Sequence, residues 1–212
     1  MNKKLTGLYA ITDESLMPVN VFQSMAEAAL ASGAKIIQYR DKSHDAEKRI
    51  KQANELRDLC NKYNAILIIN DDIELTLKSN ADGIHLGKDD TSIHAARKRL
   101  GPNKIIGVSC YNKTSLAEKA IKDGVDYIAF GSFFGSSIKP DAPKADAQLI
   151  ATIKKHHATP VCCIGGITTK NCGELLSEKA DMLAIITELF SSQNTLDIQK
   201  KCTEFLNAFN NT

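Results

Sequence analysis

The chain has 212 residues, a length that a single α/β barrel domain commonly reaches. Its 27 basic and 25 acidic residues give a formal net charge of +2, so bulk charge does not indicate binding to nucleic acid or to a membrane surface. Tryptophan is absent and aromatic residues make up 6%, which disfavours a stacking platform for single-stranded nucleic acid. These properties favour a small-molecule ligand bound by a local site.

The sequence also predicts a cytoplasmic protein. The N-terminus lacks the apolar core and cleavage site of a signal peptide, and no apolar run is long enough to cross a bilayer. The six cysteines form no CxxC pair and lie mostly among apolar neighbours, which favours reduced structural thiols over disulfides or a zinc site. A homo-oligomer is compatible with these features.

Apolar, β-rich runs alternate with amphipathic stretches along the whole chain. The runs cover 7–12, 35–40, 65–70, 83–87, 104–110, 127–131, 160–166 and 182–187, and 196–209 has the spacing of a final, eighth helix. Eight βα repeats without a linker in the middle of the chain favour a closed barrel over an open sheet. We therefore expect an α/β fold, a single (β/α)8 TIM barrel over residues 1–212.

Two cations follow the second run. Arg40 and Lys42 lie two residues apart, so in an extended backbone both side chains point the same way. Such a pair can grip a phosphate chain, because a guanidinium and an ammonium both donate hydrogen bonds to its oxygens. The alternative is a surface pair that flanks Asp41.

Acidic residues follow the third and fourth runs in pairs. Asn70 and Asp71 close the third run, and Asp90 follows the fourth. Mg²⁺ takes few protein carboxylates and completes its coordination with water and phosphate oxygens, so Asp71 and Asp90 are predicted to bind it together with a diphosphate. The alternative is that the doubled acids, including Asp72 and Asp89, only cap the following helices.

A second anion site is predicted after the last two runs. Gly165 and Gly166 open a helix and expose backbone N–H groups, while Ile186 and Thr187 close the eighth run. Barrels often bind a phosphate between these two loops. A glycine pair can also form nothing more than a tight turn.

Three other residues are candidates for ligand contact or acid–base chemistry. Ser109 ends the fifth run, as an anion donor or a turn residue with no base evident beside it. Lys139 lies on the long connection 132–145, which we interpret as an active-site lid, and it either reaches an anion or stays solvated. His85, within the fourth run, is either an acid–base group or a hydrogen-bonded structural residue, and no Ser-His-Asp arrangement is evident.

Seven motifs occur in order along nearly the whole chain. They are GLYAITD (7–13), QYRDK (38–42), INDD (69–72), DGIHLG (82–87), GVS (107–109), FGSFF (130–134) and IGGI (164–167). Together they resemble the thiamine-phosphate synthase family, including its thiazole tautomerase branch. The resemblance implies a transferase of thiamine biosynthesis that joins hydroxymethylpyrimidine diphosphate to a thiazole phosphate, giving thiamine phosphate and pyrophosphate.

By the same resemblance, pyrophosphate leaves first with the help of Mg²⁺, and the thiazole nitrogen captures the resulting pyrimidine-methyl cation. No residue acts as a nucleophile, and Arg40, Lys42 and Lys139 act electrostatically. The implied contacts are Arg40, Lys42, Asn70, Ser109 and Lys139 for the diphosphate, Asp71 and Asp90 for Mg²⁺, Gln38 for the pyrimidine, Gly166, Ile186 and Thr187 for the thiazole phosphate, and Ser136 as a further substrate-binding residue.

The chain departs from the family pattern at four positions. Ile138 stands where Thr is usual, Lys88 for Gln, Gly135 for Pro and Thr187 for Ser. Thr187 keeps a hydroxyl, whereas Ile138 loses one. Two alternatives follow from the departures and from the breadth of the family: a thiazole tautomerase, which would not need the diphosphate and magnesium residues, or a non-catalytic thiazole-phosphate binding or regulatory protein.

Overall fold

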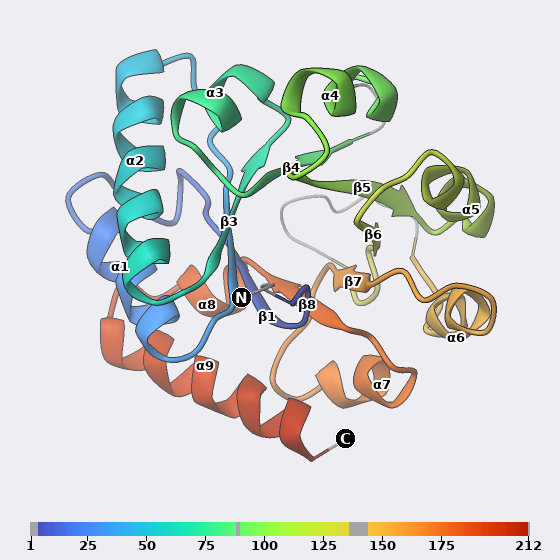
Figure 1. Cartoon of the computed structure of the whole chain (residues 1–212). Helices are drawn as coiled ribbons and strands as arrows, with labels where there is room; N and C mark the ends of the chain where they lie inside the picture. The colour runs from blue at the N-terminus through green and yellow to red at the C-terminus, as the bar shows by residue number, and fades with distance from the viewer. Residues whose placement is uncertain (1–3, 88–89, 136–143, 212) are drawn as a thin grey trace.

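Eight parallel strands close into a barrel that helices surround (Figure 1). This computed structural model describes residues 4–87, 90–135 and 144–211. The strands are β1 (Gly7–Ile11), β2 (Ile36–Tyr39), β3 (Ile66–Asn70), β4 (Gly83–Leu86), β5 (Ile105–Tyr111), β6 (Tyr127–Phe130), β7 (Val161–Ile164) and β8 (Met182–Ile185). The helices are α1 (Phe22–Ala31), α2 (Ala46–Lys62), α3 (Ile73–Lys78), α4 (Ile93–Leu100), α5 (Thr114–Lys122), α6 (Gln148–Lys154), α7 (Cys172–Ser177), α8 (Thr187–Phe190) and α9 (Thr195–Asn210).

The predicted (β/α)8 architecture is confirmed. Each strand pairs in parallel with the next one along the chain, and β8 pairs with β1, which closes the barrel. The predicted helix 196–209 corresponds to α9, but the short helix α8 precedes it, so α9 is not the eighth helix as expected. A segment as short as α8 carries too few residues to show a helical period.

Side chains alternate along each strand between the barrel interior and the ring of helices. The interior holds a buried cluster that includes Tyr9, Ile36, Ile66, Ile68, Tyr127, Cys162 and Met182. The opposite faces of the strands pack against the helices, through residues such as Leu8, Ile37, Leu67, Met25 and Leu56. This double burial explains why the strands read as continuous apolar runs rather than as an alternating pattern.

The apolar filling of the barrel gives way to polar side chains near the carboxyl ends of the strands. Gln38 on β2, His85 on β4 and Ser109 on β5 take interior positions there. All six cysteines are free and buried, as expected for structural thiols. Within 4–87, 90–135 and 144–211, no helix combines the length and apolar character that a membrane span requires.

Candidate active site

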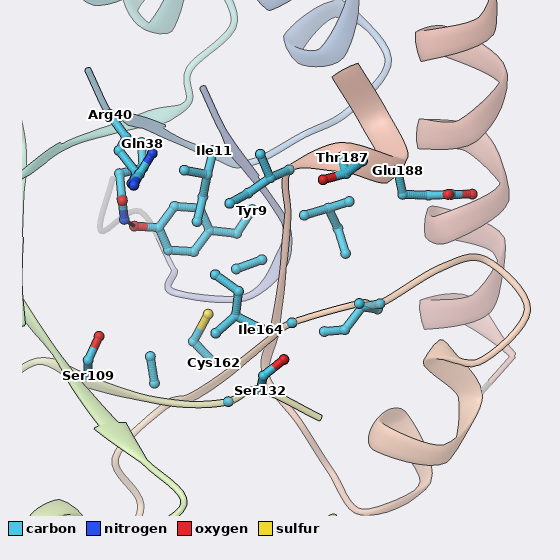
Figure 2. A pocket seen from close by; sticks show the side chains of 18 of the residues that line it. Tyr9, Ile11, Gln38, Arg40, Ser109, Ser132, Cys162, Ile164, Thr187 and Glu188 are labelled. Carbon is cyan, nitrogen blue, oxygen red and sulfur yellow. Dashed lines mark hydrogen bonds between the residues drawn. The ribbon is translucent and has the colours of Figure 1, made fainter. Parts of the chain in front are cut away.

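A cavity of about 380 Å³ lies at the carboxyl ends of the strands (Figure 2). Every strand contributes lining, either directly or through the residues that follow it. Seven of the predicted ligand residues line the cavity: Gln38, Arg40, Asn70, Ser109, Gly166, Ile186 and Thr187. The volume suits a small-molecule site, and the predictions from separate loops converge on one space.

The two cations after β2 diverge. Arg40 lines the cavity, and its Nη1 lies 3.4 Å from a carboxylate of the loop after β1. Lys42 reaches toward the loop after β3, where its Nζ lies 2.5 Å from Asp71 Oδ2. Asp41, which lies between the two cations in the sequence, is paired with Lys48 at 2.7 Å. Because the Lys42 side chain is 52% exposed, it can move onto a bound anion.

Asn70, Asp71 and Asp90 form an acidic corner beside the cavity. Asn70 Nδ2 donates a hydrogen bond to Asp71 Oδ2 at 2.5 Å, and the backbone N–H of Gly87 donates to Asp90 Oδ2 at 2.6 Å. The pKa of Asp90 is raised, first by burial and then by the neighbouring Asp71 carboxyl group. Two acids are therefore held together with incomplete charge compensation.

This acidic corner fits a shared Mg²⁺ better than a closed metal site. Among the residues that the structure describes, no group of three or more His, Cys, Asp and Glu side chains could hold a metal. Two carboxylates suffice for Mg²⁺, since it keeps several waters and takes further oxygens from a phosphorylated ligand. A divalent cation would also relieve the repulsion that raises the pKa of Asp90.

The helix caps after β3 and β4 come from other residues. Asp72 accepts a hydrogen bond from a backbone N–H in the first turn of α3 at 2.8 Å. Ser92 does the same for α4 at 3.3 Å. The alternative that Asp71 and Asp90 are caps is therefore wrong, whereas Asp89 lies outside the described residues.

The loop after β7 forms the other end of the cavity. Gly165 and Gly166 have φ values of 105° and 63°, and a Cβ on Gly166 would lie 1.9 Å from the carbonyl oxygen of Gly135. Only glycine fits where these two loops meet. Contrary to the prediction, the glycine pair does not open a helix directly: α7 begins only at Cys172, after a turn in which the Thr168 N–H donates to Asn171 Oδ1 at 2.8 Å.

The β8 end of the cavity is formed by Ile186 and Thr187, and Thr187 begins α8. Glu188 also contributes to the cavity wall. Figure 2 shows its carboxylate directed away from the labelled cavity residues, toward the long helix beside them. A ligand anion at this end would therefore meet backbone and hydroxyl groups rather than the Glu188 charge.

Comparison with known proteins identifies the family. The family model described as "Thiamine monophosphate synthase" matches residues 8–189. The chain belongs to this synthase family. It is 44% identical over 203 residues to the thiamine-phosphate synthase of Thiobacillus denitrificans, which covers 96% of this chain and 94% of that relative.

Solved structures agree with this membership. The thiamine phosphate pyrophosphorylase from Pyrococcus furiosus is 30% identical, with a TM-score of 0.87 over 97% of this chain and 96% of that one. The thiamine phosphate pyrophosphorylase from Bacteroides thetaiotaomicron is 15% identical, with a TM-score of 0.72 over 96% and 98%, and it shows the shared fold. The family predicted from the motifs is confirmed, and the relatives support a transferase enzyme.

In this member of the synthase family, five side chains form a continuous set of hydrogen bonds through the barrel, which we call the interior chain. Gln38 Nε2 donates to the Tyr9 hydroxyl at 2.7 Å, and the Tyr9 and Tyr127 hydroxyls lie 2.9 Å apart. The Tyr127 hydroxyl lies 2.9 Å from His85 Nδ1, and His85 Nε2 lies 2.9 Å from Ser109 Oγ. Both ends of the interior chain, Gln38 and Ser109, line the cavity.

No base beside Ser109 is evident in the sequence, but the fold brings one there. His85 lies at hydrogen-bond distance, because the register of β4 on β5 places it opposite Gly107, one interior position before Ser109. His85 is hydrogen-bonded, as in the structural alternative, and it also lines the cavity. Its Nδ1 faces Tyr127 where a serine hydrolase has a carboxylate, so the arrangement does not reproduce a catalytic triad.

Ser132 is a cavity residue that was not predicted as a ligand contact, although the motif FGSFF contains it. Its side chain is buried, and its Oγ has no hydrogen-bond partner among the described residues. A Cβ on Gly165 would lie 2.1 Å from this oxygen, so the hydroxyl lies directly against the glycine pair. Figure 2 shows the oxygen pointing toward the cavity. A buried hydroxyl without a partner is unfavourable unless a ligand completes its hydrogen bonding.

Five positions singled out in the sequence lie outside the described residues. They are Lys88, Asp89, Ser136, Ile138 and Lys139. The interpretation of 132–145 as a lid falls largely on the same segment and stays a prediction. The ligand contacts assigned to all the site residues likewise stay predictions.

Proposed function

We propose that this protein is a thiamine-phosphate synthase that joins hydroxymethylpyrimidine diphosphate to a thiazole phosphate and releases pyrophosphate. The observation that supports this most strongly is a single cavity with two ends suited to anions. One end carries Arg40, Asn70 and Ser109, and the other carries Gly166 and Thr187. A transfer between two phosphorylated molecules needs both to be held in contact in one site.

In the first step of the proposed mechanism, the bond between the pyrimidine methylene carbon and the diphosphate oxygen breaks, and its electron pair leaves on the oxygen. Arg40 and Lys42 donate charge-assisted hydrogen bonds to the oxygens on which negative charge grows. Asp71 and Asp90 would hold Mg²⁺, which supplies further positive charge to the same oxygens when it is bound.

In the second step, the lone pair of the thiazole nitrogen forms the new carbon–nitrogen bond. Gln38 holds the pyrimidine ring, and the backbone at Gly166 with the Thr187 hydroxyl holds the thiazole phosphate. No protein nucleophile or base is needed, so Ser109 acts as a hydrogen-bond donor. Apolar walls at Ile11 and Ile164 limit the access of water, which would otherwise capture the pyrimidine-methyl cation formed in the first step.

A reconstitution tests the proposal directly. The purified protein is mixed with both phosphorylated precursors, with and without Mg²⁺, and thiamine phosphate and pyrophosphate are quantified. We expect both products in equal amounts and only with the metal. Binding of both ligands without product would indicate a binding protein, and isomerisation of the thiazole phosphate alone would indicate a tautomerase.

The Ser132→Ala variant is expected to weaken thiazole phosphate binding while making the free protein as stable or more stable. The hydroxyl has no partner in the described residues, so its loss removes an unfavourable burial, but a ligand phosphate loses a donor. The loss of affinity should be roughly tenfold at most, as for one neutral hydrogen bond. Calorimetric titration and thermal melts measure the two effects.

Ser43→Ala is the control, because it also removes a serine hydroxyl, but one that lies beside the Asp41 carboxylate and does not line the cavity. It should leave the thiazole phosphate affinity unchanged, whatever it does to the melting temperature. A Ser132→Ala protein that binds the phosphate as tightly as the native one would remove Ser132 from the site.

A further inference from the structure

The interior chain joins two cavity residues, Gln38 and Ser109, through three side chains of the barrel interior: Tyr9, Tyr127 and His85. We propose that Tyr9, Tyr127 and His85 are positioning residues that fix the direction of hydrogen bonding at both ends, leaving an acceptor oxygen at Gln38 and a hydroxyl donor at Ser109. The inference rests on the proposed function only for the names of the ligands. The direction itself is a property of the free protein.

Counting protons along the interior chain gives the direction. Gln38 Nε2 donates to Tyr9, so the single hydroxyl hydrogen of Tyr9 is left for Tyr127, and that of Tyr127 is left for His85 Nδ1. With Nδ1 accepting, the ring proton is on Nε2, which donates to Ser109 Oγ. The hydroxyl hydrogen of Ser109 then remains for a ligand in the cavity.

Both tyrosines keep their protons in this setting. Burial raises the pKa of Tyr9 and of Tyr127 well above the ordinary value for a phenol, so each hydroxyl carries one hydrogen at neutral pH. Each can therefore donate once and accept from its other neighbour. This fixed count makes the interior chain directional rather than a set of independent contacts.

The other protonation states of His85 leave a buried hydrogen without an acceptor. If Nδ1 carried a proton, it would donate to Tyr127, and the hydrogen of Tyr127 would turn toward Tyr9. Tyr9 already accepts from Gln38, and within the described hydrogen bonds its own hydrogen would then have no acceptor. Because Tyr9 is 1% exposed, water cannot relieve this.

Packing holds the rings of the interior chain in place. A Cβ on Gly107 would lie 1.9 Å from Tyr127 Cζ, so the tyrosine ring occupies space that only glycine leaves open. The ring of His85 stacks on Tyr127 at a centroid distance of 5.6 Å, and Tyr9 meets Tyr127 edge-on at 6.2 Å. The hydroxyl positions are therefore set by the barrel and not by the ligand.

The direction predicts which chemistry each end accepts. Gln38 lines the cavity, and in the described part of the chain its carboxamide oxygen accepts no hydrogen bond, so it is available to an N–H donor of the ligand. Ser109 offers a donor, which suits a phosphate oxygen. The cavity should therefore select a ring that carries an amino group at the Gln38 end and reject an analogue with an oxo group in that place.

The tautomer of His85 tests the direction without any substrate. Long-range ¹H–¹⁵N correlation spectra of the labelled, ligand-free protein show which ring nitrogen carries the proton, and His85→Gln assigns the signals. We expect the proton on Nε2 at neutral pH. A proton mainly on Nδ1 would overturn the proposal, whatever the synthase assay shows, so the two failures are distinguishable.

Two variants then test the coupling along the interior chain. Gln38→Glu puts a carboxylate beside Tyr9, which at mildly alkaline pH can only accept, so every hydrogen bond should reverse and the His85 proton should move toward Nδ1. Tyr39→Phe is the control, because it removes a buried hydroxyl that donates to Gln52 at 3.0 Å outside the barrel interior. An unchanged tautomer in a folded Gln38→Glu protein would contradict the coupling.

Tyr127→Phe breaks the interior chain at its centre. It should give a mixture of His85 tautomers. It should also lower the affinity for the diphosphate substrate roughly three- to tenfold, the range for one neutral hydrogen bond, and leave the thiazole phosphate affinity unchanged. It should also narrow the discrimination between the amino and oxo analogues of that substrate. If this variant does not fold, Tyr9→Phe breaks the interior chain at the neighbouring hydroxyl instead. An equal loss of affinity for both substrates would indicate a merely structural role.

Discussion

Replacing either acid of the acidic corner with asparagine is expected to lower turnover by about 10²-fold or more without unfolding the protein. Asp71 has a φ of 63°, a left-handed conformation that asparagine tolerates and alanine does not, so Asp71→Asn removes the charge and keeps the backbone. With one carboxylate gone, the positive charge that Mg²⁺ would bring to the leaving oxygens is lost, while Arg40 and Lys42 remain. Steady-state rates over a range of Mg²⁺ concentrations measure the effect.

Thermal melts give a second readout that does not depend on activity. The raised pKa of Asp90 means that the folded protein holds this proton more tightly than the unfolded chain, so the ionised carboxyl group lowers stability as the pH rises through that pKa. Asp90→Asn should therefore melt at the native temperature or higher without metal. Added Mg²⁺ should raise the melting temperature of the native protein and not that of either variant.

Asp72→Asn is the matched control for the acidic corner. It removes a neighbouring charge, but asparagine caps a helix as well as aspartate, so α3 keeps its cap. Turnover of this control should stay near the native value. If Asp71→Asn and Asp90→Asn also turn over at the native rate when Mg²⁺ is limiting, the metal assignment is wrong.

The strands and their order could be predicted because burial on both faces leaves a strong local signal. A run such as Ile66–Asn70 is apolar up to its last residue, and its polar end marks the rim of the barrel. The doubled acids were also informative: one acid, Asp72, caps the helix and its neighbour Asp71 is left for the rim. By contrast, α8 is too short to leave a periodic signal.

The interior chain could not be predicted because it depends on register and closure. Tyr9 and Tyr127 are 118 residues apart, and their hydroxyls meet only when the barrel closes with the observed stagger. His85 and Ser109 lie on neighbouring strands, but a slip of one residue would send one of them to the outer face. The orphaned hydroxyl of Ser132 likewise depends on loop backbones that meet only in the folded protein.

Gly166→Ala and Arg40→Met are expected each to lower the affinity for a different substrate. A Cβ on Gly166 would lie 1.9 Å from the backbone oxygen of Gly135, so the two loops that meet there must move apart. The affinity for the thiazole phosphate should then fall by on the order of 10²-fold. Arg40→Met keeps roughly the length of the side chain and removes its charge. This change should lower the affinity for the diphosphate substrate roughly ten- to a hundredfold. Two-substrate kinetics give an apparent affinity for each ligand in each variant.

Gly101→Ala separates the effect of backbone strain from the effect on the site. Gly101 has a φ of 80° and ends α4, where an added Cβ meets nothing within 4 Å. It should lower stability through strain and leave both affinities unchanged. If Gly166→Ala and Arg40→Met each lower the affinity for both substrates equally, the division of the cavity into two anion ends is wrong. If each variant lowers the affinity for the expected substrate alone, the two loops hold separate phosphates. A transfer from one phosphorylated molecule to another requires this arrangement.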